Sequence, residues 1–149
     1  GATNVIPDEV KLAGTFRTFD EKWRIDAHER MVKLATGIAE SMGATCDFEV
    51  RKGYPSLINE EKLTNSSRTF AVEYLGAENV LELDIWPAAE DFSYYSQEIN
   101  ACFYRLGTGN AAAGISSAVH TPTFDIDENA LKLSIGLMSY ITIRQLDAE

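Results

Sequence analysis

Segments that alternate apolar and polar residues flank one long segment of helical periodicity, and this order limits the fold more than any other feature. Residues 9–19 (EVKLAGTFRTF) place their apolar side chains on one face and Lys11 and Arg17 on the other, as a half-buried strand does. Residues 45–51 (TCDFEVR) alternate in the same way. The segment between them, residues 21–42, predicts an amphipathic helix.

This first part of the chain predicts a sheet covered by a helix. Asp20 is a suitable N-cap for the helix, Gly43 ends it, and residues 4–8 (NVIPD) resemble a strand end followed by a turn at Pro7. For the order strand, strand, helix, strand, one more strand and helix in front would complete a ferredoxin-like lobe. A connection with Gly and Pro at residues 52–59 (KGYPSLIN) marks the expected lobe boundary.

The rest of the chain continues to alternate strand-like and helix-like segments, so the expected fold class is α/β. In chain order we expect a helix at 59–75 capped by Asn59 and ended by Gly76, a strand at 79–85, a short helix at 92–99, a strand at 102–106, and a helix at 128–146 that begins in a capping box of Asp125 and Glu128. The last helix is apolar nearly all round, so we expect burial on more than one side.

Composition excludes several classes of protein. With 149 residues, 45% of them hydrophobic and 24% charged, the chain can form one domain or two small lobes. Its net charge of −10 argues against nucleic acid as a partner, because phosphate binding needs clustered Lys and Arg. No apolar run is long enough for a membrane span, and no signal segment opens the chain, so a soluble cytoplasmic protein is expected. Cys46 and Cys102 are expected to be buried free thiols, with a disulfide between them as the less favoured alternative.

His120 is the first candidate for chemistry. It lies in a long loop, residues 107–122, between a strand-like segment and an apolar helix, and imidazole is a good ligand for Zn²⁺ and similar metals. Taken alone, a loop histidine is more often a hydrogen-bonded surface residue. His28 lies at the border of the apolar stripe of residues 21–42, and we interpret it as a satisfied structural histidine.

Two further pairs of residues could contribute to a site. Arg17 could bind a carboxylate through two parallel hydrogen bonds, and the Asn4 amide could add another. On the sequence alone, an exposed strand Arg and a turn Asn are the better explanation of both. Glu90 and Asp91 precede the expected short helix, where carboxylates favour the helix dipole. They could also orient a metal-bound histidine through hydrogen bonds.

The motifs occur in an order that resembles the M20 metallo-amidohydrolases, a family that includes N-acyl-amino-acid, hippurate and auxin-conjugate hydrolases. The resemblance extends over nearly the whole chain. The matching stretches are residues 4–8 (NVIPD), 12–20 (LAGTFRTFD), 53–55 (GYP), 90–92 (EDF), 106–110 (LGTGN), and 120–125 (HTPTFD). In the family, the motif at 90–92 is usually preceded by two glycines, where this chain has Ala88 and Ala89.

The resemblance implies an enzyme that hydrolyses the amide bond of N-acyl amino acids or small peptides with water activated by two metals, most often Zn, with Mn or Co as alternatives. It implies that residues 1–51 are the second half of a ferredoxin-like lid and dimerisation domain, and that residues 52–149 are the C-terminal part of an α/β zinc-peptidase-like catalytic domain. A homodimer through the lid is implied as well.

The resemblance also implies roles for single residues. His120 matches the last metal ligand of the family, and Asn4 and Arg17 match lid residues that hold the substrate carboxylate. Gly107 and Gly109 belong to a turn near the substrate, and Glu90 and Asp91 to the motif around the metal site.

On this interpretation the chain is a fragment. The general base and the other metal ligands are expected upstream of it, and the 149 residues alone are expected to be inactive and metal-free. The alternative is a non-catalytic module that binds carboxylates or dimerises. A module is expected to complete its own lobe, whereas this chain opens within strand-like sequence.

Overall fold

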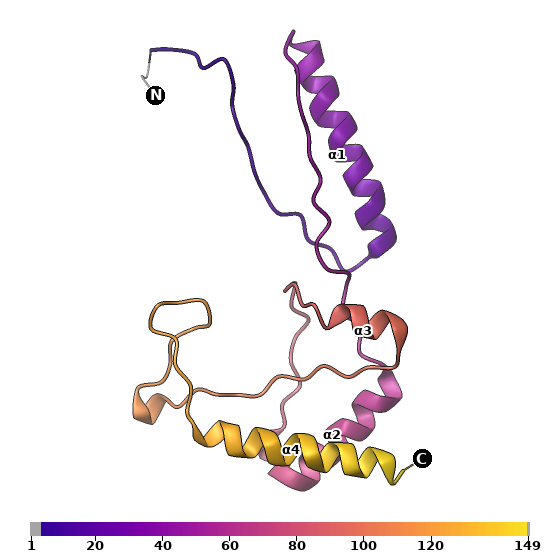
Figure 1. Ribbon diagram of the computed structural model, residues 1–149, viewed down its shortest axis with the longest axis vertical. Helices are drawn as coiled ribbons and strands as arrows, with labels where there is room; N and C mark the ends of the chain where they lie inside the picture. The colour runs from indigo at the N-terminus through magenta and orange to yellow at the C-terminus, as the bar shows by residue number, and fades with distance from the viewer. Residues whose placement is uncertain (1–3, 149) are drawn as a thin grey trace. The chain divides into compact units, whose positions relative to one another are not determined.

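The computed structural model describes residues 4–148, and the chain divides into two compact units (Figure 1). The first unit comprises Gly1–Ser56 with Pro87–Ala89, and the second comprises Leu57–Trp86 with Glu90–Glu149. The roles of residues 1–51 as part of a lid and of residues 52–149 as part of a catalytic domain stay predictions.

One long helix dominates the first unit. Helix α1 (Glu21–Ser41) begins where the Asp20 carboxylate accepts hydrogen bonds from the backbone N–H groups of Lys22 and Trp23, at 2.8 and 3.0 Å. It ends before Gly43, whose φ of 77° lies in the left-handed region that glycine adopts most readily. The predicted helix, its cap and its end are therefore confirmed.

The structure does not confirm the predicted strands or the α/β fold class. Residues 4–148 form helices and no β-strand, and their one isolated bridge joins Asn110 to Ile115. The segments predicted as strands run as non-helical chain, and residue 79 ends a short 3₁₀ helix, η1 (Ala77–Asn79). A strand is stabilised by a ladder of hydrogen bonds to a neighbour. Alternation specifies the apolar face of such a segment and leaves its partner unspecified.

Three α-helices form the second unit, and two of them make its core. Helices α2 (Glu61–Leu75) and α4 (Asn129–Leu146) pack together, and their buried contact joins Phe70 to Leu137 and Ile141. Helix α3 (Ser93–Glu98) is a single short segment within the range predicted for it. The helix predictions for this part are thus confirmed, with differences at two of the N-termini.

Both differences concern which residue caps a helix. The Glu60 carboxylate, not Asn59, caps α2 through the N–H groups of Lys62 and Leu63, and these bonds lower the pKa of Glu60. Asn59 instead exchanges two hydrogen bonds with the backbone of Phe103, at 2.9 and 2.7 Å. The predicted capping box at α4 is also wrong.

At α4, the helix begins beyond both residues of that box. The Asp125 carboxylate accepts from the N–H of its neighbour Ile126, and Glu128 makes no capping hydrogen bond. The N–H of Asn129 is instead bound by the Asp127 carboxylate at 3.0 Å. A choice between two carboxylates in an Asp-Ile-Asp sequence depends on what else each one contacts.

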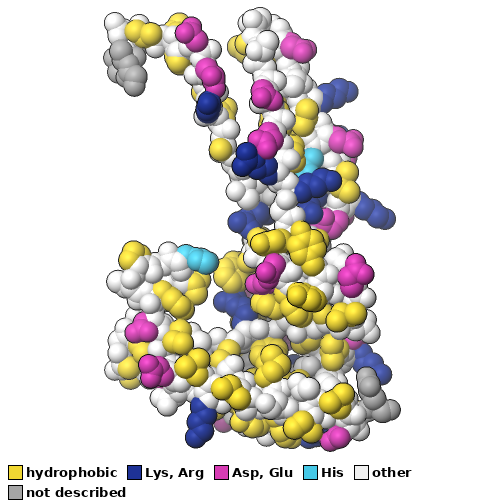
Figure 2. All heavy atoms as spheres, in the orientation of Figure 1, with side chains coloured by type: hydrophobic (Ala, Val, Ile, Leu, Met, Phe, Trp, Pro, Cys, Tyr) yellow, Lys and Arg dark blue, Asp and Glu magenta, His cyan; other side chains and the backbone are white. Residues whose placement is uncertain are grey.

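Most of the apolar surface of α4 is exposed, which contradicts the expected burial on more than one side. Ala130, Leu137 and Ile141 are buried, and other apolar residues of the helix are open, with Leu133 at 48% and Ile135 at 71% exposed. Figure 2 shows hydrophobic side chains spread over the visible surface of this unit. The second unit is too small to cover a helix that is apolar on several sides.

A glycine lets the two core helices approach closely. A Cβ atom built on Gly136 in α4 would lie 2.0 Å from the hydroxyl oxygen of Tyr74 in α2. The Tyr74 ring packs against Tyr140 with ring centroids 5.4 Å apart. Tyr140 also donates a hydrogen bond to Glu73, which pairs with Arg144, so polar contacts cover one edge of this apolar contact.

Candidate functional site

The loop that carries His120 is closed at its base by a bond between two side chains. The Asn110 amide Nδ2 donates to the Asp127 carboxylate at 2.7 Å, across 17 positions of sequence. Beside it, the backbone N–H of Asp127 donates to the carbonyl of Thr108 at 2.8 Å. Figure 1 shows the intervening chain as a short helix followed by a ring, after which the chain leads into α4. Two hydrogen bonds therefore hold the two ends of the loop together.

Within the loop, Asn110 also organises the first turn. Its backbone exchanges hydrogen bonds with Ile115 in both directions, at 2.8 and 2.9 Å, and its side-chain oxygen accepts from the N–H of Ala113. The enclosed residues form a short 3₁₀ helix, η2 (Ala111–Ala113), which ends at Gly114 with a φ of 78°. Asn110 thus uses its backbone and both polar atoms of its side chain.

His120 occupies the far part of the loop in an uncommon backbone conformation. Its φ is 63°, and among residues 4–148 it is the one non-glycine residue with a positive φ. Such residues are uncommon and are enriched at functional sites. Two contacts surround it: the Thr121 hydroxyl donates to the carbonyl of Ala118 at 2.7 Å, and the hydroxyls of Ser117 and Thr123 lie 2.9 Å apart.

The His120 side chain fits a single metal ligand rather than a complete metal site. The residue is exposed, and its imidazole makes no hydrogen bond or ion pair to any part of the chain that the structure describes. Across residues 4–148, no group of three or more His, Cys, Asp or Glu side chains could hold a metal ion. The chemistry of one free imidazole matches Zn²⁺, Mn²⁺ or Co²⁺, and further ligands have to come from elsewhere.

The bond at the base of the loop predicts a dependence on acid. The hydrogen bond from Asn110, followed by that from the backbone of Asn129, lowers the pKa of Asp127 below its ordinary value of 3.8. Because the folded-state pKa is the lower one, ionised Asp127 stabilises the loop above pH 3.8, and this contribution is lost as the pH falls through the lowered pKa. The protection of the backbone amides of residues 111–126 against hydrogen exchange should therefore fall only as the pH drops through the lowered pKa of Asp127. In Asp127→Asn, this acid-induced change should disappear.

Glu90 and Asp91 lie at the start of α3, as expected. The Glu90 carboxylate accepts from the backbone N–H of Phe92, and the Asp91 carboxylate makes no hydrogen bond to the residues that the structure describes. The Glu90 carbonyl accepts from the hydroxyl and the N–H of Ser93, at 2.6 and 3.2 Å, and the Asp91 carbonyl accepts from Tyr94. No described contact joins either carboxylate to His120. Their role in orienting a metal-bound histidine stays a prediction.

The predicted carboxylate-binding residues belong to the first unit. Arg17 is exposed, and its guanidinium donates to the carbonyl of Pro87 at 3.1 Å. Asn4 is exposed at the first described turn. In the second unit, Gly107 and Gly109 lie in the exposed segment that enters the His120 loop. The roles of these four residues in binding a substrate stay predictions.

His28, in α1, was interpreted as a structural histidine with its hydrogen bonds satisfied, and the structure differs from this in one respect. His28 stacks edge-on near Phe16, with ring centroids 6.3 Å apart, as a structural residue does. Its Nδ1 atom is buried without a hydrogen-bond partner, so the expected satisfaction is wrong for this atom. The two cysteines, Cys46 and Cys102, are free, as predicted, and are half-buried rather than buried.

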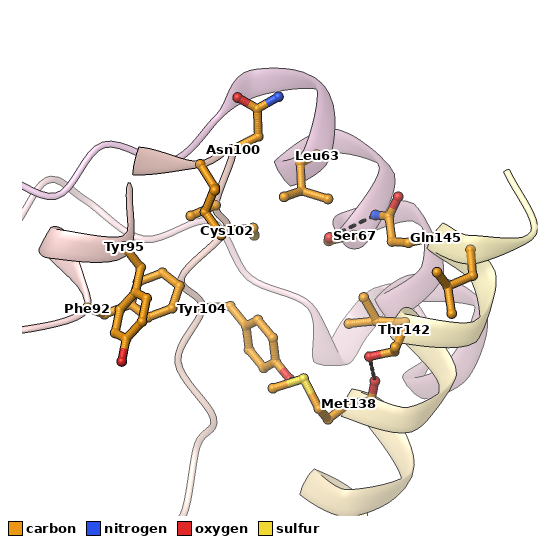
Figure 3. Close-up of a pocket in the computed structure, with 14 residues that line it drawn as sticks. Leu63, Ser67, Phe92, Tyr95, Asn100, Cys102, Tyr104, Met138, Thr142 and Gln145 are labelled. Atoms are coloured by element: carbon orange, nitrogen blue, oxygen red, sulfur yellow. Dashed lines mark hydrogen bonds between the residues drawn. The ribbon is translucent and has the colours of Figure 1, made fainter. Parts of the chain in front are cut away.

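The sequence did not predict a groove between α2, α4 and the segment around Cys102. Figure 3 shows Tyr95 and Tyr104 on one side of it and Met138 and Thr142 on the other. Its volume is about 360 Å³, and Gln145 crosses one end to hydrogen-bond Ser66 and Ser67. The His120 loop contributes no residue to it. The roles of Asn110 and Asp127 were also missed, although Asn110 ends the stretch 106–110 and Asp127 lies two residues beyond the stretch 120–125.

Comparisons with known proteins agree on one family. The model described as peptidase family M20/M25/M40 matches residues 3–142. The chain is 33% identical to IAA-amino acid hydrolase ILR1-like 4 of Arabidopsis thaliana, over 98% of this chain and 34% of that protein. It is 34% identical to N-acetylcysteine deacetylase of Bacillus subtilis (strain 168), over 88% and 33%. It is 32% identical to thermostable carboxypeptidase 1 of Saccharolobus solfataricus, over 87% and 33%.

These matches extend over only part of each relative. The chain spans about a third of the length of the curated relatives it matches. No solved structure gives a match. Among the helices of residues 4–148, none combines the length and the apolar character that crossing a membrane requires.

Proposed function

Because the chain belongs to peptidase family M20/M25/M40, we propose that it forms part of a longer metal-dependent amidohydrolase, which cleaves the amide bond of an N-acyl amino acid or a small peptide. The names of an IAA-amino acid hydrolase, an N-acetylcysteine deacetylase and a carboxypeptidase among the relatives support this substrate class. The observation that carries the proposal is the exposed, unpaired imidazole of His120 on a loop held at both ends.

In this proposal, His120 provides one nitrogen ligand to a site of two divalent metals, most often Zn with Mn or Co as alternatives. When bound, such metals polarise the acyl carbonyl and lower the pKa of a bound water. The rest of the metal site and the general base come from parts of the longer protein. The family also leads us to expect an α/β fold there, in which the unpaired segments of this chain find neighbours.

Arg17 and Asn4 orient the substrate in this proposal. A guanidinium binds a carboxylate with two parallel hydrogen bonds, and this geometry holds the scissile amide in one place. In the structure, one N–H group of the Arg17 guanidinium donates to the Pro87 carbonyl, and its other N–H groups are available to bind an anion. The net charge of −10 makes such a local cation necessary for an anionic substrate. The first unit also provides the surface of the proposed homodimer.

Replacing Arg17 is expected to affect binding more than catalysis. Hydrogen bonds to charged groups contribute about 1.5–3 kcal/mol, so Arg17→Ala should raise KM by about 10- to 100-fold for substrates with a free carboxylate. Arg17→Lys keeps the charge and loses the paired geometry, so it should recover only part of the loss. The matched control is the carboxamide form of the same substrate, whose KM should not change. Equal losses for both forms would contradict the assigned role.

The proposed activity is tested by assaying the longer protein, loaded with Zn, Mn or Co, for release of free amine. N-acetyl and N-benzoyl amino acids and dipeptides cover the substrate class. Amine release that stops on chelation and returns with metal supports the proposal. A folded, metal-loaded protein that binds amino acids without turnover would favour the alternative, a non-catalytic module that binds carboxylates.

A further inference from the structure

We propose that Asn110 and Asp127 are positioning residues, whose hydrogen bond places the His120 imidazole for metal binding. The inference deepens the proposed function and depends on His120 being a metal ligand. It assigns a purpose to a contact between two residues that do not themselves reach the metal. Nothing in the sequence pattern paired them.

The first step concerns what the contact joins. Asp127 accepts from Asn110 through Oδ2, at 2.7 Å, and from the backbone and side chain of Asn129 through Oδ1, at 3.0 and 2.9 Å. One carboxylate therefore ties the entrance of the loop to the first residue of α4. Since α4 packs on α2 through Leu137 and Ile141, the loop is attached to the packed part of the unit.

The second step concerns the far end of the loop. His120 has a φ of 63°, a backbone conformation that is uncommon among residues other than glycine, although histidine adopts it more often than most. The contacts near it, from Thr121 to Ala118 and between Ser117 and Thr123, lie within the loop and do not reach the helices. Outside the loop, its ends are fixed by Asp127 through Asn110 and Thr108. Loss of the bond from Asn110 leaves only the backbone bond from Asp127 to Thr108 at the base of the loop. We therefore expect the segment that carries the imidazole to become more mobile.

The third step concerns tolerance. Catalytic and metal-binding geometry is lost when a supporting contact lets a side chain move by about 1 Å. Partners that orient metal ligands contribute roughly 10- to 100-fold to metal affinity when they bond the ligand itself. Asn110 and Asp127 act through the backbone, and we expect an effect within the same range.

The hydrogen-bond pattern permits an exchange of the two side chains. In Asn110→Asp, two carboxylates face each other and the bond is lost. In the double variant Asn110→Asp with Asp127→Asn, the new amide can donate to the new carboxylate. The carboxylate at 110 still accepts from Ala113, and the amide oxygen at 127 still accepts from the N–H of Asn129. The exchange thus keeps the bonds that the argument uses. Asn129→Ala is the matched control, because it removes only a side-chain contact to the same carboxylate.

The experiment uses the longer protein with Co²⁺ in place of its metal, so that the visible absorption of the ion reports its ligands. Affinity is measured by competition with a chelator. We expect Asn110→Asp to weaken Co²⁺ binding at one site by about 10- to 100-fold and to shift the spectrum toward that of His120→Ala. The double variant and Asn129→Ala should each bind Co²⁺ with an affinity within about threefold of that of the parent. Both should also show the absorption spectrum of the parent. In the metal-free protein, a strong amide–Hα Overhauser effect within His120, which marks positive φ, should weaken in Asn110→Asp and return in the double variant.

The outcomes separate the two proposals. If His120→Ala leaves the Co²⁺ spectrum unchanged, His120 is not a ligand and the proposed function fails. If His120→Ala changes the spectrum and a folded Asn110→Asp does not, the positioning role alone is overturned. Asn110→Ser, which removes the donor without adding charge, replaces Asn110→Asp where the charged variant fails to fold, and the same two readings apply to it.

Discussion

Replacing His120 by alanine is expected to remove one metal from the longer protein and to lower kcat by more than about 100-fold. The reason is that loss of a partner that merely orients a ligand already costs up to about 100-fold in affinity or activity, and His120 is proposed to be the ligand itself. Metal content after dialysis and steady-state kinetics check the two parts. Protein stability should change little, because the imidazole is exposed and makes no described hydrogen bond.

Two controls belong with this variant. His28→Ala removes the other histidine of the chain, which lies in α1, and it should leave the metal content unchanged. His120→Asn preserves the left-handed backbone better than alanine, because asparagine tolerates positive φ. Loss of metal in both His120 variants assigns the effect to the imidazole and not to the backbone. A fully loaded His120→Ala protein would end the metal-ligand hypothesis.

Replacing Leu137 by alanine is expected to destabilise the second unit by about 2–5 kcal/mol, the usual cost of removing a large buried aliphatic side chain. Leu137 is 3% exposed and contacts the core of α2 and α4. The midpoint of urea unfolding of the 149-residue chain, followed by circular dichroism, measures the change. An effect below about 1 kcal/mol would contradict the packing of the two helices.

Leu133 provides the matched control, since it is the same residue type in the same helix at 48% exposure. In the 149-residue chain, Leu133→Ala should change stability by no more than about 0.5 kcal/mol, as exposed substitutions do. In the longer protein the same substitution should cost about 2 kcal/mol or more if other parts cover that face. A small effect in both proteins would show that the exposed apolar side of α4 is open to solvent in both.

The helices could be predicted because their ends depend on neighbouring residues. Asp20 can reach only the N–H groups just after it, and Gly43 and Gly76 have positive φ where a helix has to stop. The predicted strands were not found in the described part of the chain, because a strand depends on residues that are distant in the sequence. A strand needs a partner that the local pattern does not identify, and the residues described here provide none.

The candidate site also has a part that the local sequence predicts and a part that depends on distant residues. His120 could be singled out because a histidine in a loop with the motif His-Thr-Pro resembles a known family. Its supporting bond could not, because Asn110 and Asp127 are 17 positions apart and either could have bonded locally. The sequence favoured Asp125 as the helix cap because Asp125 and Glu128 have the spacing of a capping box. Asp127, the carboxylate that binds the N–H of Asn129, is also the one that the distant Asn110 amide contacts.

The close approach of Tyr74 to Gly136 has a consequence for engineering. Replacing a helical glycine by alanine is a common way to stabilise a protein, and it is worth about 0.5–1 kcal/mol where the site is open. At position 136 the added methyl group would overlap the hydroxyl of Tyr74, so this ring, which packs against Tyr140, would have to shift. A thermostabilisation programme should therefore leave this glycine in place and look for gains in the surface residues of α1.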